Sequence, residues 1–153
     1  MARTEEAGRA AAARQVAAVK LVLPYPVSAN RYWRTVVAQR RDGPKKPRAL
    51  TFVSEEAKAF KSECAWRAKA AGFREPLAGT VELRVRLVPK NRVCMDLDNA
   101  LKVTIDALKG IVYGDDAQVY RIVADRADPD PAGARLEIEI LPLVMPMALE
   151  AAA

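Results

Sequence analysis

The sequence predicts a single small α+β domain in which a mixed β-sheet packs against two main helices. Four segments have the alternating or β-branched apolar pattern of strands, and two have the apolar spacing of amphipathic helices. The chain has 153 residues, 51% of them hydrophobic, which suits one domain with one core. The predicted order is β-α-β-α-β-β over residues 17–144, with a flexible N-terminal extension at 1–16 and a C-terminal tail at 145–153.

The first strand is expected in "AAVKLVLPYP", where two prolines end an apolar, β-branched run. The stretch that follows, Ser28–Arg48, carries seven basic residues and one acidic residue. Its prolines, its charge and its adjacent Tyr32 and Trp33 predict a mobile basic loop. Such a loop is suited to a polyanion, although an ordinary solvated loop has the same composition.

The first helix is expected in "EEAKAFKSECAWRAKAAG", with Ser54 as its N-cap and Gly72 at its end. One face of this helix is predicted to hold Phe60, Cys64 and Ala68, which are four residues apart. The next segment, "GTVELRVRLVP", alternates apolar and charged residues. It predicts a half-buried strand.

The second helix is expected to be capped by Asp96 or Asp98 and to end at Gly110. Its apolar stripe is predicted to consist of Leu101, Ile105 and Leu108. Two further strands follow in "AQVYRIVADRA" and "ARLEIEILPLV". Because "DPDPAG" joins them as a turn rich in Asp, Pro and Gly, they are expected to pair as an antiparallel hairpin.

The charge balance favours a polyanionic partner. The chain has twenty-five Lys and Arg residues and nineteen Asp and Glu residues, which gives a net charge of +6 and a pI near 9.5. Nucleic acid is the first expectation and an anionic membrane surface the second. No apolar run approaches the ~20 residues that span a bilayer, and the alanine-rich start lacks the apolar core of a signal peptide. A cytoplasmic protein without a membrane segment is therefore expected.

The sequence contains no histidine, which excludes Ser-His-Asp and Cys-His catalysis and histidine-ligated zinc. Two cysteines, Cys64 and Cys94, are too few for a zinc cluster and are expected to be reduced. Hydrolytic chemistry in this chain would have to rest on carboxylates, lysine and a hard cation. Oxygen ligands of this kind select magnesium or manganese.

Carboxylates are concentrated between Asp96 and Tyr120, in "DLDNALKVTIDALKGIVYGDDAQVY". In a helix, Asp98, Lys102 and Asp106 line one polar face, and Asp96 lies just before it. Clustered carboxylates repel one another unless they are solvated, paired or metal-bound. This arrangement resembles a metal-assisted phosphodiesterase site.

The second acidic group, Asp115 and Asp116, follows the helix. If the next strand runs back beside the strand that ends at Pro89, Asp116 is expected to approach the start of the helix. The aspartates could equally be helix caps and turn residues, and Lys102 with Asp106 a surface ion pair of ~0.3–0.5 kcal/mol. Gln118 could be an ordinary exposed strand residue.

"DLDNALKVTIDALKG" followed by "YGDDAQV" resembles the RusA family of Holliday junction resolvases. The shared pattern is Asp-x-Asp-Asn, a lysine, Asp-Ala-Leu and Asp-Asp-x-Gln-Val. A second match, "LPYPVSANRYWR", is similar to the N-terminal block of that family. The resemblance covers roughly residues 18 to 143.

This resemblance implies a homodimeric, magnesium-dependent endonuclease that nicks two opposing strands of a four-way DNA junction in recombination and repair. It identifies Asp96, Asp98 and Asp116 as metal ligands and Lys102 as the essential lysine, with Asp115 as a further candidate ligand. Asn99 and Asp106 match the pattern without an assigned role. The chain departs from the family at 93–95, where "VCM" replaces basic residues, and this bears on junction affinity or sequence preference more than on the chemistry.

DNA contacts are expected from the basic stretch. The residues concerned are Asn30, Arg31, Arg34, Arg40, Arg41, Lys45, Lys46 and Arg48. Two alternatives remain open: a metal nuclease for other branched DNA such as flaps and forks, and a DNA-binding module without catalytic activity. Only a nuclease requires Mg²⁺, or Mn²⁺ in its place, for cleavage.

Overall fold

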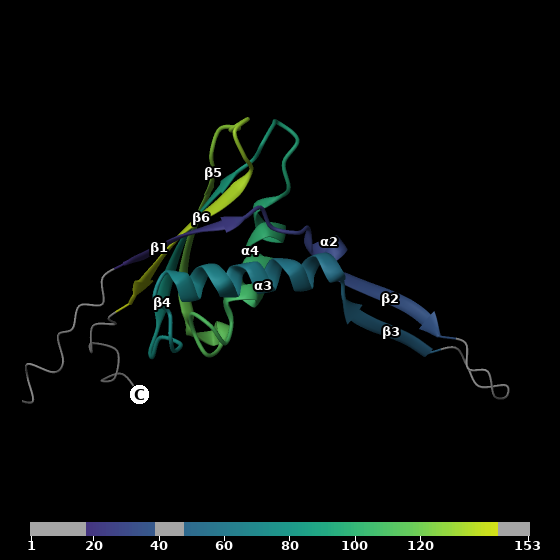
Figure 1. Ribbon diagram of the computed structural model, residues 1–153, viewed down its shortest axis with the longest axis horizontal. Helices are drawn as coiled ribbons and strands as arrows, with labels where there is room; N and C mark the ends of the chain where they lie inside the picture. The colour runs from purple at the N-terminus through teal and green to yellow at the C-terminus, as the bar shows by residue number, and fades with distance from the viewer. Residues whose placement is uncertain (1–17, 39–47, 144–153) are drawn as a thin grey trace, which may run out of the picture.

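The computed structural model describes residues 18–38 and 48–143 (Figure 1). Within these residues a four-stranded mixed sheet has the order β1-β6-β4-β5. Its strands are β1 (Val19–Pro24), β4 (Val81–Val88), β5 (Val119–Arg126) and β6 (Arg135–Pro142). The main helices are α3 (Glu55–Ala70) and α4 (Leu97–Leu108). The predicted α+β class, with a mixed sheet and two main helices, is confirmed.

The predicted hairpin of the last two strands is wrong. β5 pairs in parallel with β4, because α4 carries the chain back to the beginning of β4 before β5 starts. β6 lies between β1 and β4 and is antiparallel to both. The inward side chains of β6 are fully buried, whereas most of β5 is exposed, so the more apolar strand occupies the centre.

The described part of the basic stretch is also not a loop. The single-turn helix α2 (Ala29–Tyr32) leads into β2 (Trp33–Ala38), which pairs antiparallel with β3 (Arg48–Val53). This ribbon extends away from the body of the molecule (Figure 1). The runs "TVV" and "LTFV" are rich in β-branched and aromatic residues, which favour strands, but the high density of basic residues hid this signal.

The helices bury one face each against the sheet. Ser54 caps α3 by accepting a hydrogen bond from the Ala57 backbone N–H at 3.2 Å, and the predicted buried face of α3 is confirmed. The buried face of α4 is rotated from the predicted stripe, since Leu101 and Ile105 are only partly buried. Its buried residues are Ala100, Val103, Thr104, Ala107 and Leu108. No helix within the described ranges is long and apolar enough to cross a membrane.

Candidate active site

The N-terminal end of α4 presents two exposed aspartates. Asp96 occupies the N-cap position, but its side chain forms no capping hydrogen bond, and Asp98 lies in the first turn. Among the described residues, neither carboxylate has a cationic partner or a hydrogen-bond donor. Both are therefore available to an external cation.

The second acidic group lies at the opposite end of α4. Lys109 directly follows the helix, and its Nζ is 3.0 Å from Asp115 Oδ2 and 3.0 Å from Asp116 Oδ1. Asp115 Oδ1 also accepts a hydrogen bond from the Ala117 backbone N–H at 2.9 Å. This backbone bond and the Lys109 ammonium lower the pKa of Asp115 to about 2, and the two carboxylates raise the pKa of Lys109.

Gln118 organises the turn that carries this second group. Its Oε1 accepts hydrogen bonds from the backbone N–H groups of Gly114 and Asp115, and its Nε2 donates to the carbonyl groups of Leu77 and Gly79. Four backbone groups are thereby satisfied by one side chain. The alternative that Gln118 is an ordinary exposed strand residue does not hold, because Gln118 ends the 3-10 turn Asp116–Gln118.

One chain does not bring the three predicted metal ligands together. α4 has twelve residues and is about 18 Å long at the usual rise of 1.5 Å per residue. Asp96 and Asp98 are at its beginning, while Asp116 is held by Lys109 beyond its end. Accordingly, the described residues contain no group of three or more acidic, cysteine or histidine side chains placed to hold a metal ion.

Lys102 lies between the two ends of α4 and lines a pocket between α4 and α2, with Tyr32, Trp33 and Asp106 among its neighbours. It forms no ion pair with any described residue, so the predicted surface pair of Lys102 with Asp98 or Asp106 is absent from this part of the chain. The exposed Lys102 ammonium is therefore accessible to a ligand that binds at the pocket.

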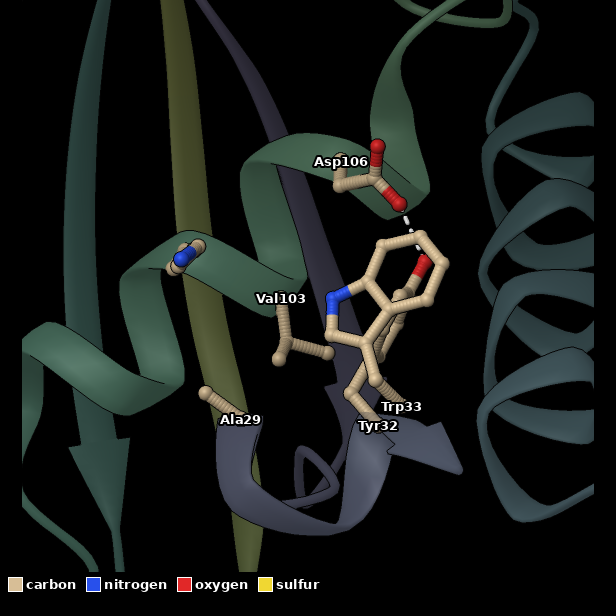
Figure 2. A pocket seen from close by; sticks show the side chains of 6 residues that line it. Ala29, Tyr32, Trp33, Val103 and Asp106 are labelled. Atoms are coloured by element: carbon tan, nitrogen blue, oxygen red, sulfur yellow. Dashed lines mark hydrogen bonds between the residues drawn. The ribbon is translucent and has the colours of Figure 1, made fainter. Parts of the chain in front are cut away.

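Asp106 is instead held by two other residues. The Tyr32 hydroxyl donates to Asp106 Oδ2, as Figure 2 shows, and Lys61 Nζ lies 3.2 Å from the same oxygen. Partial burial disfavours the ionised form, but these hydrogen bonds outweigh it and lower the pKa of Asp106. Burial and the neighbouring carboxylate raise the pKa of Tyr32. Asp106 thus ties α2 to α4 and α3.

The N-terminal sequence block contacts the acidic block at a second point. The Tyr25 hydroxyl accepts a hydrogen bond from the backbone N–H of Met95 at 3.3 Å, and Arg126 Nη2 donates to the Met95 carbonyl oxygen at 3.0 Å. Met95 immediately precedes Asp96. These two contacts hold the segment from which Asp96 and Asp98 project.

The predicted DNA-contacting residues fall into two sets. Asn30 and Arg31 lie on α2 and Arg34 on β2, all exposed, and Arg31 forms an ion pair with Glu56 at 2.7 Å. Arg48 begins β3. The remaining four, Arg40, Arg41, Lys45 and Lys46, lie outside the described residues.

Sequence reasoning missed the residues that position the acidic groups. Tyr25, Tyr32, Lys109 and Arg126 were not singled out as contributors to the site. The signal that could have found two of them is the joint presence of both sequence blocks, since Tyr25 and Tyr32 belong to the first block and contact the second. Lys109 and Arg126 make contacts that depend on the folded topology.

These features define a small α+β protein with acidic groups at both ends of one helix, an exposed lysine between them and a protruding basic ribbon. The family model for endodeoxyribonuclease RusA matches residues 24–141, and the chain belongs to this family. It is 37% identical over 123 residues to the crossover junction endodeoxyribonuclease RusA of Escherichia coli strain K12, covering 78% of this chain and 91% of that protein. The enzymes of the same name from Enterobacteria phage 82 and Shigella sonnei are 35% identical over the same shares.

Proposed function

We propose that this chain is a magnesium-dependent endonuclease that resolves four-way DNA junctions by paired nicks in opposing strands, with manganese as a substitute metal. Membership of the RusA family supports a junction substrate, because the relatives are crossover junction endodeoxyribonucleases. The observation that carries the proposal is the pair of exposed carboxylates of Asp96 and Asp98 in the matching motif, which have no partner among residues 18–38 and 48–143.

The residues present fit a hard divalent cation. Asp96, Asp98 and Asp116 offer only carboxylate oxygens, the donors that magnesium and manganese prefer. Asp115 is the weaker candidate ligand, because one of its oxygens already caps the turn at Ala117. A divalent ion held by these carboxylates would supply Lewis-acid stabilisation of the charge on the scissile phosphate and would activate water, so that histidine would be unnecessary.

Lys102 supplies a second positive charge. It projects from the turn of α4 that follows Asp98, and no described carboxylate neutralises it. In this role its ammonium group orients the attacking water or stabilises the charge that develops on the phosphate oxygens. Asp106 lies one turn further on, but its bonds to Tyr32 and Lys61 give it a supporting role in fixing α4.

The separation of the aspartates gives the homodimer a chemical role. Since α4, about 18 Å long, separates Asp98 in its first turn from the Lys109 that holds Asp116 beyond its end, the partner subunit is proposed to supply Asp116 to each metal site. A two-fold dimer then has two equivalent sites, each built from both chains. This symmetry matches the approximate two-fold symmetry of a four-way junction and accounts for nicks in two opposing strands.

The basic ribbon and α2 are proposed to contact the phosphate backbone of the junction. Arg34 is exposed on β2 and directly follows Trp33, which lines the Lys102 pocket. The charge of +6 favours DNA as the partner. A DNA substrate is consistent with the expected cytoplasmic location.

The test is cleavage of a four-way junction with and without Mg²⁺, compared with flaps, forks and linear duplex. Magnesium-dependent paired nicking of the junction, well above that of the other substrates, is the expected result. Preferred cleavage of flaps or forks would replace the proposed substrate with other branched DNA. Junction binding without cleavage in any divalent metal would identify a DNA-binding module.

A further inference from the structure

We propose that two copies of this chain associate through β5, whose free edges pair antiparallel around a two-fold axis at Val123. The inference rests on the proposed homodimeric resolvase and names its interface. β5 is an edge strand eight residues long, and within the described ranges no segment pairs with its outer edge. An edge of this length presents a row of unpaired backbone groups that a second strand can satisfy.

The exposed side chains of β5 are unusually apolar for an unpaired edge. Tyr120, Ile122 and Val123 are 61%, 42% and 50% exposed. The opposite edge of the sheet, β1, is shorter and ends in Pro24, which has no backbone N–H to donate. A strand partner for β5 would cover apolar surface that the single chain leaves in water.

The sequence of β5 is complementary to itself in one antiparallel register. Pairing with β4 aligns Arg121, Val123 and Asp125 with Glu82, Arg84 and Arg86, on the sheet face away from the helices. Within one chain Arg121 lies 3.2 Å from Glu82, and Asp125 lies 3.8 Å from Arg86. If the axis passes through Val123, each Arg121 also lies opposite the partner's Asp125, and the two Val123 side chains meet. Both ion pairs then form across the interface, and a shift of the axis by one residue, to Ile122 or Ala124, loses them.

This register also brings the Asp116 of one chain toward the Asp96 and Asp98 of the other. Antiparallel pairing places the beginning of the partner's β5 beside the end of β5 in the first chain. That end carries Arg126, whose guanidinium binds the Met95 carbonyl next to Asp96. Asp116 lies three residues before Val119, the first residue of β5. The partner's Asp116 therefore arrives on the side where Asp96 and Asp98 project.

The test is a symmetric disulfide at the axis. Val123→Cys is introduced into a Cys94→Ala background of the full chain, which leaves the buried Cys64 as the other thiol. The matched control is Val22→Cys in the same background, because Val22 is 51% exposed on the other edge strand. Mild oxidation is expected to convert most of the Val123→Cys protein into a covalent dimer that still cleaves junctions, and to leave the Val22→Cys protein uncrosslinked.

A second variant tests the interface without relying on oxidation. Within one chain, Val123→Glu places a carboxylate beside Arg84, so the protein should fold normally. At the two-fold axis it places two carboxylates opposite each other. The dissociation constant of the dimer, measured by sedimentation, should therefore rise at least tenfold. An active, undissociated Val123→Glu dimer, together with no disulfide at position 123, overturns the β5 pairing and leaves the proposed resolvase intact. A disulfide at position 123 in a parent protein that cleaves no junction supports the pairing and refutes the proposed function.

Discussion

The two ends of α4 use the same residue type in opposite ways. At the beginning of the helix, Asp96 and Asp98 are exposed and have no described partner. Beyond its end, Asp115 and Asp116 share the Lys109 ammonium, and Asp115 also caps a turn. Free carboxylates can bind a cation at little structural cost, whereas bound ones already contribute to folding. Asp116 must therefore exchange its lysine for a metal ion if it is to be a ligand.

The largest expected effect is at the free end. Asp98→Asn, like Asp96→Asn, should lower the single-turnover rate of junction cleavage by about 10³-fold or more, because several kcal/mol of metal-dependent stabilisation is lost. Junction binding should stay equal or tighten, since a charge that repels phosphate is removed. Asp115→Asn is the matched comparison at the other end of the helix. Its single-turnover rate should fall by no more than about twofold, because Asp115 is the weaker candidate ligand. Equal losses of cleavage rate in Asp98→Asn and Asp115→Asn would contradict the proposal that the two ends of α4 differ in metal binding.

The next effect concerns the lysine between the two ends. Lys102→Ala should slow single-turnover cleavage by roughly 10²-fold, as expected when a preorganised electrostatic contact is removed. Lys102→Arg should recover only part of the rate, because it keeps the charge but changes its geometry. Lys58→Ala on α3, which removes a surface ion pair with Glu55, is the control and should leave the rate unchanged. A Lys102→Ala rate close to that of the control would assign Lys102 to the solvated surface.

A smaller effect is expected from the basic residues around the ribbon. Each phosphate contact removed should reduce the slope of log Kd against log salt by ~0.9. Replacing Arg34 alone, and then Arg40, Arg41, Lys45 and Lys46 with it, should therefore flatten the slope stepwise while the cleavage rate of the bound complex changes little. Titration of a labelled junction at several salt concentrations measures this. A slope that stays constant through the series would place the DNA surface on another part of the molecule.

The smallest effect is a pH dependence of stability at the bound end. The pKa of Asp115 is lowered to about 2, so its contribution to stability is complete above the unfolded pKa near 3.9 and is lost as the pH falls toward 2. The difference in Tm between the parent and Asp115→Asn should thus be largest at pH 6 and shrink steadily below pH 4. A difference that is independent of pH would mean that Asp115 is not held by Lys109 and the Ala117 amide.

Local patterns predicted the local parts of this molecule. The Ser54 cap, the buried face of α3 and the alternation of β4 from Leu83 to Leu87 follow from neighbouring residues alone, and each is confirmed. Glu82 departs from the predicted alternation, because it is buried and pairs with Arg84 and Arg121. The pairing of β6 between β1 and β4 does not follow from neighbours, because a turn such as "DPDPAG" allows a hairpin or a longer crossing equally well. The strand order depends instead on which strand buries more apolar surface, and β6 buries more of its apolar side chains than β5.

The candidate site divides in the same way. The motif identified the acidic residues and Lys102, since their spacing is short and local. It could not indicate that Asp116 lies at the far end of α4 from Asp98, because this depends on β5 running parallel to β4. Nor could it indicate that Gln118 binds Leu77 and Gly79, about forty residues away.

The central claim is that each metal site is shared between two subunits, and a mixed dimer tests it most directly. Asp98→Asn and Asp116→Asn chains carrying different tags are co-expressed, and the dimer with one chain of each kind is purified by both tags. Each variant alone is expected to be inactive. In the mixed dimer, one site receives both substitutions and the other receives neither, so junctions should be nicked in a single strand at about half the parental rate, as for one of two equivalent sites. A mixed dimer as inactive as the two parental variants would show that all three aspartates act within one chain and would contradict the account.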